Sequence, residues 1–140
     1  MRQTLRIIQC LRAPVGGLFR HVIDLTRAQA EQGHAVGIIC DASTGGEAAD
    51  AALAAIAPYA KLGIRRVAMS RDIGLADIGA YRATLRFARD TGADVLHGHG
   101  AKGGAFARLA VAMMASSRAR PAAFYTPHGG SLHYDSSSVA

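Results

Sequence analysis

The sequence has little of several residue types that mark particular classes of protein. Its 140 residues include two cysteines, no tryptophan and only 6% aromatic residues. Two cysteines cannot form the dense disulfide framework of a small secreted domain. Each of them, Cys10 and Cys40, ends an apolar run, where a thiol usually behaves as a small buried hydrophobe. We therefore expect no disulfide.

Long apolar runs are lacking as well. No stretch approaches about 18 uninterrupted apolar residues, the usual requirement of a membrane-spanning helix. The apolar stretch from Leu5 to Leu11 contains Arg6 and lacks a small-residue cleavage pattern, so it is not read as a signal peptide. We expect a cytoplasmic protein with one folded domain over residues 1–135 and a disordered tail over residues 136–140.

Basic residues outnumber acidic ones by sixteen to ten, which gives a formal net charge of +6. They are mostly arginines, spread along the chain without a basic block and without the interleaved aromatic residues that stack on bases. Nucleic acid is therefore not an expected partner. The densest group is Arg82, Arg86 and Arg89, whose spacing places them on one side of a helix. Such a stripe is either a solvated face or a surface that contacts anionic lipid.

Short apolar runs alternate with segments of helical periodicity along the whole chain. We expect strands at 5–10, 34–40, 64–69, 94–97 and 122–126, and helices at 17–32, 47–60, 105–115 and around an apolar stripe of Ile78, Tyr81, Leu85 and Ala88. This alternation predicts a doubly wound, Rossmann-like α/β fold with a parallel sheet of about five strands. In such folds ligands bind beyond the carboxyl ends of the strands, here at the loops after the first, fourth and fifth.

The segment Pro14-Val15-Gly16-Gly17 leads directly into the first predicted helix. Two glycines there let backbone N–H groups approach an anion at the positive end of the helix dipole. The same pair can equally serve only to make a tight turn between strand and helix. An isolated Gly-Gly pair favours the second interpretation.

The segment from His97 to Gly104 is the richest in candidate functional residues. Gly98, Gly100 and Gly103 match the Gly-x-Gly-x-x-Gly pattern of dinucleotide-binding proteins, including nicotinamide-dependent oxidoreductases. That pattern belongs to the first βα turn, whereas this is the fourth. About 20 residues further on, where an acidic residue should bind the ribose, the sequence is basic. The predicted Gly-rich turn, from Gly98 to Gly104, also fails the phosphate-loop pattern.

Four histidines and an aspartate fall near the same predicted edge of the sheet: His97, His99, His128, His133 and Asp135. His-x-His pairs ligate metals, but alternate residues of a strand share one face without any ligand, and the fourth loop has no carboxylate. We expect one core histidine and one exposed histidine there rather than a metal site. With only two glutamates, both in predicted helices, a two-carboxylate glycosidase is not expected either.

Four motifs together resemble the N-terminal domain of group 4 retaining glycosyltransferases, which have the GT-B fold. They are Gly-Gly-Leu-Phe-Arg-His-Val-Ile-Asp-Leu entering the first helix, Gly-His-Ala-Val before the second strand, Asp-Val-Leu-His-Gly-His-Gly, and Tyr-Thr-Pro-His-Gly-Gly. Their order and spacing agree with the family over essentially the whole chain. The resemblance implies two Rossmann-like domains facing across a cleft, of which this is the acceptor-side one.

The resemblance implies transfer of a sugar from a nucleotide-sugar donor to an acceptor glycan or lipid-linked sugar, with retention at the anomeric carbon and without a metal or other cofactor. Gly16 and Gly17 would lie against the donor diphosphate, and His99 would be the catalytic residue that faces the transferring sugar. His128 and Gly129 would line the acceptor side, where Lys102 would add charge. The leaving diphosphate would be stabilised electrostatically.

The resemblance also implies a second domain. The family's Glu-x7-Glu pair belongs to a C-terminal nucleotide-sugar-binding domain, which is absent from this sequence. We expect the chain to be inactive alone and to act with such a domain in cis or in trans, with peripheral membrane contact as a further interaction. The alternatives are a stand-alone Rossmann-like module that binds a phosphorylated ligand and, less favoured, a nicotinamide-dependent oxidoreductase.

Overall fold

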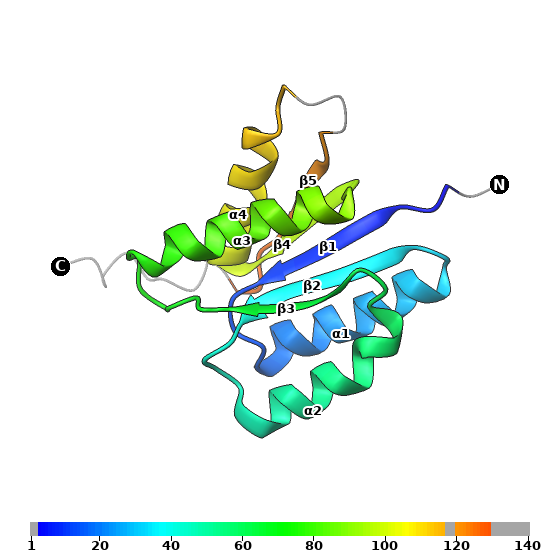
Figure 1. Cartoon of the computed structure of the whole chain (residues 1–140). Coiled ribbons are helices and arrows are strands. Elements are labelled where there is room, and N and C mark those ends of the chain that lie inside the picture. The colour runs from blue at the N-terminus through cyan, green and yellow to red at the C-terminus, as the bar shows by residue number, and fades with distance from the viewer. Residues whose placement is uncertain (1–2, 117–119, 130–140) are drawn as a thin grey trace.

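Five strands and four α-helices alternate along the chain in a computed structural model that describes residues 3–116 and 120–129 (Figure 1). The strands are β1 (Arg6–Leu11), β2 (Ala35–Asp41), β3 (Gly63–Val67), β4 (Val95–His99) and β5 (Ala122–Thr126). The helices are α1 (Gly16–Glu31), α2 (Gly46–Ile56), α3 (Ala76–Thr91) and α4 (Gly100–Met113), and a short 3₁₀ helix, η1 (Ala57–Tyr59), follows α2. The predicted α/β fold class is confirmed, whereas the predicted tail at 136–140 lies outside the described residues.

The five strands form one all-parallel sheet in the order β3-β2-β1-β4-β5. From β1 the chain first builds outward through β2 and β3, and then crosses to the other side of β1 to add β4 and β5. The switch in direction therefore lies between β1 and β4, where doubly wound folds bind their ligands. The register pairs Leu11 with His99 and His99 with Thr126, so these three strands end at the same level.

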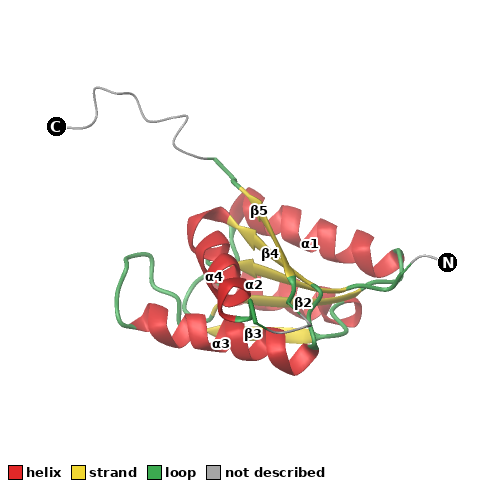
Figure 2. Ribbon diagram, turned by 90° about the horizontal axis from the view of Figure 1, so that it is seen from above, coloured by secondary structure: helices red, strands yellow, loops and turns green. Residues whose placement is uncertain are grey.

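Helices cover both faces of the sheet, α1 and α2 on one and α3 and α4 on the other (Figures 1 and 2). Each face has its own apolar core, and Cys10 belongs to the cluster under α3 and α4, whereas Cys40 belongs to the cluster under α1 and α2. Both thiols are free and buried, as predicted. Burial raises the pKa of Cys10 to about 12, which makes this thiol unreactive.

The boundary between β4 and α4 differs from the prediction. We expected a Gly-rich turn over 98–104 and a helix from Ala105, but β4 extends through His99 and α4 begins at Gly100. The glycines are needed for close packing. A Cβ atom would lie 2.4 Å from the Cα of Gly104 if added at Gly98, and 2.3 Å from the carbonyl oxygen of Cys10 if added at Gly103. The dinucleotide-like glycine pattern thus lets α4 pack directly on β1 and β4.

The buried face of α3 also differs from the predicted stripe. Its fully buried residues are Ala80, Thr84, Phe87 and Ala88. Of the predicted stripe, Ala88 is buried and Tyr81 and Leu85 are partly buried against the core, but Ile78 is 52% exposed. The helix turns to bury Phe87 completely, because an aromatic ring gains more from burial than the smaller side chains do. Gly37 of β2 makes room for this ring, since a Cβ atom there would lie 2.8 Å from it.

Candidate functional site

A cavity of about 530 Å³ opens at the carboxyl edge of the sheet, at the switch between β1 and β4. It is lined by Arg12, Ala13, Val15, Leu18, Arg71, His99, Gly100, Ala101, Lys102, His128 and Gly129. The fold thus brings together four of the residues that the sequence singled out, His99, Lys102, His128 and Gly129. Arg12 and Arg71, which the sequence did not single out, add positive charge to the same cavity.

Gly16 and Gly17 are the first two residues of α1 and lie next to this cavity, between its lining residues Val15 and Leu18. Gly16 has a φ of +68°, a value that favours glycine. Gly17 has no such requirement, and a Cβ atom added at either position would meet nothing within 4 Å. Both glycines are therefore exposed to open space, in contrast to the tightly packed Gly98 and Gly103.

Two helices, α1 and α4, begin at this cavity. Among the described residues, neither start has a side-chain cap or an acidic residue in its first turn. The first N–H groups of a helix have no partner within the helix, and they carry the positive end of its dipole. Two uncapped helix starts beside one cavity make a site that favours an anion.

His99 lies in the middle of a hydrogen-bonded row that crosses the sheet edge. Its ring is 1% exposed, and its Nε2 lies 2.7 Å from Oε1 of Gln9, whose own Nε2 donates to Oε1 of Gln29 at 2.7 Å. Because Gln9 presents an oxygen, Nε2 of His99 carries the proton and Nδ1 keeps its lone pair. That lone pair accepts a hydrogen bond from Nε2 of His128 at 3.0 Å.

His97, His99 and His128 are held in the neutral form. Burial, followed by repulsion from His97, His128 and His21, lowers the pKa of His99 to about 3. Burial is also the main cause of the lowered pKa values of His97 and His128. A histidine with a pKa near 3 is not suited to general acid or base catalysis at neutral pH. His99 can act instead as a fixed, uncharged hydrogen-bonding group.

The predicted core histidine of the His97–His99 pair is confirmed as His99, but the prediction that the other is exposed is wrong. His99 is buried, but His97 is half-buried and its Nε2 lies 2.7 Å from Oγ1 of Thr126. The two ring centroids are 4.1 Å apart, since alternate residues of a strand share one face. His133 and Asp135, also named with this group, lie outside the described residues.

Sequence reasoning missed two members of the site, Gln9 and His21. His21 comes from α1, and its ring centroid lies 5.1 Å from that of His128 and 5.8 Å from that of His99. Its sequence signal was its position one helical turn after Gly17. Gln9 could have been noticed as a polar residue inside an apolar strand, because a polar side chain is usually buried only when it is hydrogen-bonded.

Lys102 lines the cavity, but its charge is directed at the loop between β3 and α3. Its Nζ donates to the carbonyl oxygens of Ser70 at 2.6 Å and Asp72 at 2.7 Å, and to Oδ1 of Asp77 at 2.6 Å. The Lys102 ammonium holds the pKa of Asp77 below its usual range. Because an ammonium group has three protons, these contacts use its donors fully. Lys102 thus ties α4 to the loop that carries Arg71.

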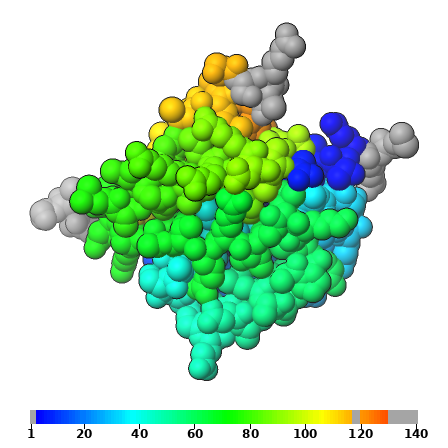
Figure 3. Space-filling view, viewed as in Figure 1, coloured from blue at the N-terminus to red at the C-terminus, as the bar shows by residue number. Residues whose placement is uncertain are grey.

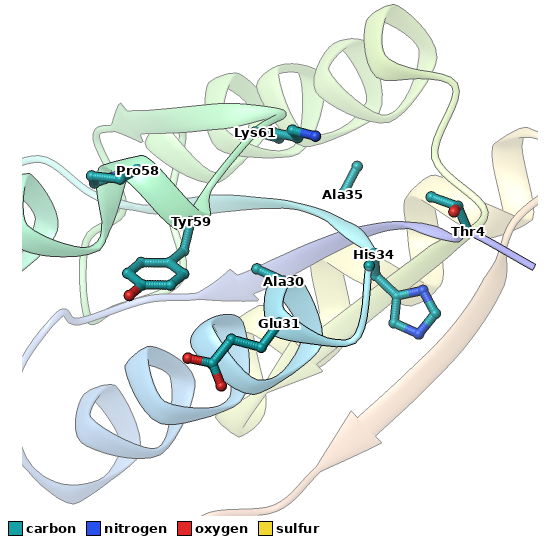
Figure 4. Close-up of a pocket in the computed structure, with 9 residues that line it drawn as sticks. Thr4, Ala30, Glu31, His34, Ala35, Pro58, Tyr59 and Lys61 are labelled. Carbon is teal, nitrogen blue, oxygen red and sulfur yellow. The ribbon is translucent and has the colours of Figure 1, made fainter. Parts of the chain in front are cut away.

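A smaller cavity of about 240 Å³ lies at the opposite edge of the sheet, where β2 begins (Figure 4). Its charged lining residues, Glu31 and Lys61, point in different directions in Figure 4, as does His34. It therefore lacks a convergent set of polar groups, and it lies at the amino ends of the strands, where doubly wound folds do not bind their main ligands.

Comparison with known proteins assigns the chain to a family. A search of curated proteins found no match. The model of a family described as Glycosyltransferase Family 4 matches residues 15–139. The matched region begins at the residue that precedes α1 and includes every candidate residue of the cavity from Gly16 to Gly129. Since the match spans most of the chain, this protein belongs to glycosyltransferase family 4, within which it corresponds to the N-terminal domain.

Proposed function

We propose that the chain is the acceptor-side half of a retaining glycosyltransferase, which moves a sugar from a nucleotide-sugar donor to an acceptor glycan or lipid-linked sugar. The observation that carries this proposal is the cavity at the strand switch, where two uncapped helix starts flank a buried neutral histidine. Membership of family 4 supplies the class of donor and acceptor. The cavity forms one wall of the substrate cleft in this proposal.

The donor diphosphate lies against the start of α1 in this proposal. Gly16 and Gly17 leave open space there, so the backbone N–H groups of the helix start can approach phosphate oxygens. Arg12 and Arg71 line the adjoining cavity and add positive charge. As the bond to the sugar breaks, negative charge grows on the diphosphate, and fixed donors of this kind stabilise it.

His99 faces the transferring sugar in this proposal, with His128 and Gly129 on the acceptor side. Both ring nitrogens of His99 have partners in the protein, Gln9 on Nε2 and His128 on Nδ1. His128 is the more accessible of the two rings. We therefore propose that His128 turns away when substrate binds, which exposes the lone pair on Nδ1 of His99 to a sugar hydroxyl.

Lys102 contributes to acceptor binding through the β3–α3 loop. Its ammonium group is occupied by Asp77 and two loop carbonyl groups, so it holds Arg71 at the cavity and does not itself bind substrate. This refines the role that the family resemblance suggested for Lys102.

Sugar transfer by a two-domain fusion tests the proposed function. The chain is fused to a nucleotide-sugar-binding domain of family 4 and screened for hydrolysis or transfer with UDP-glucose and GDP-mannose. We expect turnover by the fusion and none by the chain alone. His99→Ala should lower kcat by about a hundredfold, the usual cost of a lost transition-state hydrogen bond, while His34→Asn should leave it unchanged.

Each possible result bears on a different part of the proposal. Transfer by the unfused chain would refute the need for a second domain. A fusion that is active but insensitive to His99→Ala would refute the assignment of the site. Tight donor binding without turnover in any fusion would favour the second candidate function, a binding module for a phosphorylated ligand, which the uncapped helix starts alone could support.

A nicotinamide-dependent oxidoreductase is not favoured by the structure. Gly98 and Gly103, which suggested it, are buried against backbone atoms of α4 and β1, where no pyrophosphate can approach them. A thermal-shift measurement with NAD and NADP tests this conclusion, and we expect no stabilisation by either.

The outer face of α3 and the loop before it combine apolar and basic residues. Ile73 is 95% exposed, Leu75 87% and Ile78 52%, and α3 runs across the surface of the molecule (Figure 3). Arg82, Arg86 and Arg89 follow Ile78 at helical spacing, on the same side of α3. All three arginines are exposed. We propose that this face contacts anionic lipid, with the apolar end in the interface. None of the described helices has the length and apolarity needed to cross a membrane.

Vesicle flotation tests the lipid contact. We expect the chain to float with vesicles that contain phosphatidylglycerol and to remain unbound, in the bottom fraction, when the vesicles are pure phosphatidylcholine. Replacing Arg82, Arg86 and Arg89 together by Gln should abolish flotation, because each basic residue near an anionic surface contributes about 1 kcal/mol. The matched control replaces Arg20, Arg27 and Arg108 by Gln, which removes the same charge elsewhere. An equal loss of flotation in both triple variants would show that the net charge of the chain, and not this face of α3, governs lipid binding.

A further inference from the structure

Three histidines from separate segments of the chain converge beside the cavity, and two of them, His99 and His128, line it. His21 comes from α1, His99 ends β4, and His128 follows β5. One ring nitrogen of each lies within 4.8 Å of the corresponding nitrogens of the other two. Nδ1 of His99 and Nε2 of His128 lie 3.0 Å apart, joined by a hydrogen bond that a bound ion would replace, with the proton of His128 then carried on its Nδ1. The strand order at the switch point brings these imidazoles together even though more than 100 residues separate His21 from His128.

The orientation of His99 is the one that a metal ligand requires. Metal-binding histidines almost always donate their second ring N–H to an oxygen, which fixes the tautomer and the direction of the ligand lone pair. Nε2 of His99 donates in this way to Gln9, and Gln29 in turn holds the Gln9 amide. The lone pair on Nδ1 is therefore directed toward His128.

The distances are within reach of a four-coordinate ion. With metal–nitrogen bonds of about 2.0–2.1 Å, the ligand nitrogens of a tetrahedral site lie roughly 3.4 Å apart. Nitrogens within 4.8 Å of one another need only small shifts to meet that spacing. His21 is exposed and His128 is half-buried, so both rings can rotate toward the fixed ring of His99.

We propose that His21, His99 and His128 bind one transition-metal dication of the zinc class, with a fourth coordination position open to the cavity. Imidazole nitrogens suit zinc, copper and nickel, whereas magnesium and calcium need oxygen ligands that this set lacks. Three protein ligands with an open position are typical of reactive metal sites, and closed structural sites have four. The positive charge of Arg12 and Arg71 favours an anion, such as chloride, at the open position.

This site goes beyond the proposed sugar transfer, which requires no metal, and an ion bound to Nδ1 of His99 would occupy the lone pair that the transfer leaves for a sugar hydroxyl, so the two uses of His99 exclude each other. Its test therefore measures metal binding itself, so that a failed transfer assay and a failed metal assay remain distinct results. The purified 140-residue chain, carrying no polyhistidine tag, is freed of metal with a chelator and titrated with Zn²⁺ by calorimetry. A parallel titration with Co²⁺ follows the visible absorption that four-coordinate cobalt gives.

The variants are His21→Asn and His128→Asn, which change accessible rings and leave the buried His99 intact. The control is His34→Asn at the opposite edge of the sheet, where the Asn oxygen can replace Nδ1 as the acceptor of the Leu5 amide N–H. Circular dichroism and thermal melting confirm that each variant folds.

We expect one ion per chain. The affinity should fall by at least about tenfold in each site variant and stay unchanged in the control. Loss of just the hydrogen-bond partner of a metal ligand already lowers metal affinity by about 10–100-fold. No saturable binding by the unmodified chain would overturn the proposal. So would full binding by both site variants, or an equal loss in the control.

Discussion

At the scale of single residues, glycine serves two opposite purposes in this chain. Gly103 is buried where α4 crosses β1, and a Cβ atom there would lie 2.3 Å from the carbonyl oxygen of Cys10. Gly17 is exposed at the start of α1, where a Cβ atom would meet nothing within 4 Å. Gly103 is thus required by the fold, whereas the empty space beside Gly17 is available to a ligand.

The two glycines should respond differently to the same substitution. Gly103→Ala should lower the free energy of unfolding by at least about 1–3 kcal/mol, since the added methyl group overlaps the backbone. Gly17→Ala should keep or slightly raise it, because Ala is the better helix former by about 1 kcal/mol. Urea unfolding followed by circular dichroism measures both. Equal stabilities of the two variants would contradict the close packing of α4 on β1.

Asp41 is a buried carboxylate at the end of β2. Burial raises its pKa, but hydrogen bonds from the Met69 amide and from the hydroxyl groups of Ser43 and Thr44 together outweigh that effect, so its pKa lies below the usual value. A carboxylate with a depressed pKa stabilises the fold at pH values above its unfolded pKa of about 3.9, and this contribution is lost as the pH falls through the folded pKa.

Asp41→Asn should therefore destabilise the protein most at neutral pH. We expect a loss of about 2 kcal/mol at pH 7, typical of hydrogen bonds to a charged group. The difference between the variant and the unmodified chain should shrink as the pH falls below about 4. Chemical unfolding of both proteins at a series of pH values measures this difference. A constant difference across the acid range would show that the charge on Asp41 is not what stabilises the loop.

Part of the site can be predicted from the sequence. The rest cannot, because it depends on contacts between segments that are distant in sequence. His99 and His128 follow neighbouring parallel strands, so their proximity follows from the βα alternation alone. His21 and Gln9 depend on how α1 lies across the sheet and on hydrogen bonds between segments distant in sequence. Local periodicity carries no information about such contacts.

At the scale of the secondary-structure elements, strand positions were predictable and helix contacts were predictable only in part. Apolar runs bounded by glycine or proline located all five strands, and β5 matches its predicted bounds, Ala122–Thr126. The start of α4 was missed because buried glycines have the same sequence signal as a turn. The face of α3 was predicted only in part, because Tyr81, Leu85 and Ala88 pack on the core whereas Ile78 is exposed and Phe87, one residue from the predicted stripe, is fully buried.

The β3–α3 loop depends on one side chain from another element. Lys102→Met should release this loop, because the three contacts of Nζ with Ser70, Asp72 and Asp77 disappear while the aliphatic stem remains. We expect faster amide hydrogen exchange over residues 70–77 and little change in the strands. The exposed Lys61, mutated to Met, is the control. Unchanged exchange in Lys102→Met would mean that the loop is held by other contacts.

At the scale of the whole molecule, the parallel sheet concentrates chemistry at one edge. The carboxyl ends of β1, β4 and β5 share a cavity with the starts of α1 and α4, while the opposite edge has two smaller cavities of about 240 Å³ (Figure 4) and 340 Å³, both lined in part by His34. The overall topology was predicted from the alternation of elements and is confirmed. The central claim that follows is that the carboxyl edge is the substrate-facing wall of a family 4 glycosyltransferase.

Amide chemical shifts of the isotope-labelled chain, titrated with UDP-glucose and GDP-mannose, test this claim most directly. We expect shifts confined to the helix starts and loops of the large cavity, at Gly16, Gly17, Ala101 and Gly129, with Gly33 and Lys61 at the opposite edge unaffected. Shifts centred on Gly33 and Lys61, or no shifts with either nucleotide sugar, would contradict it.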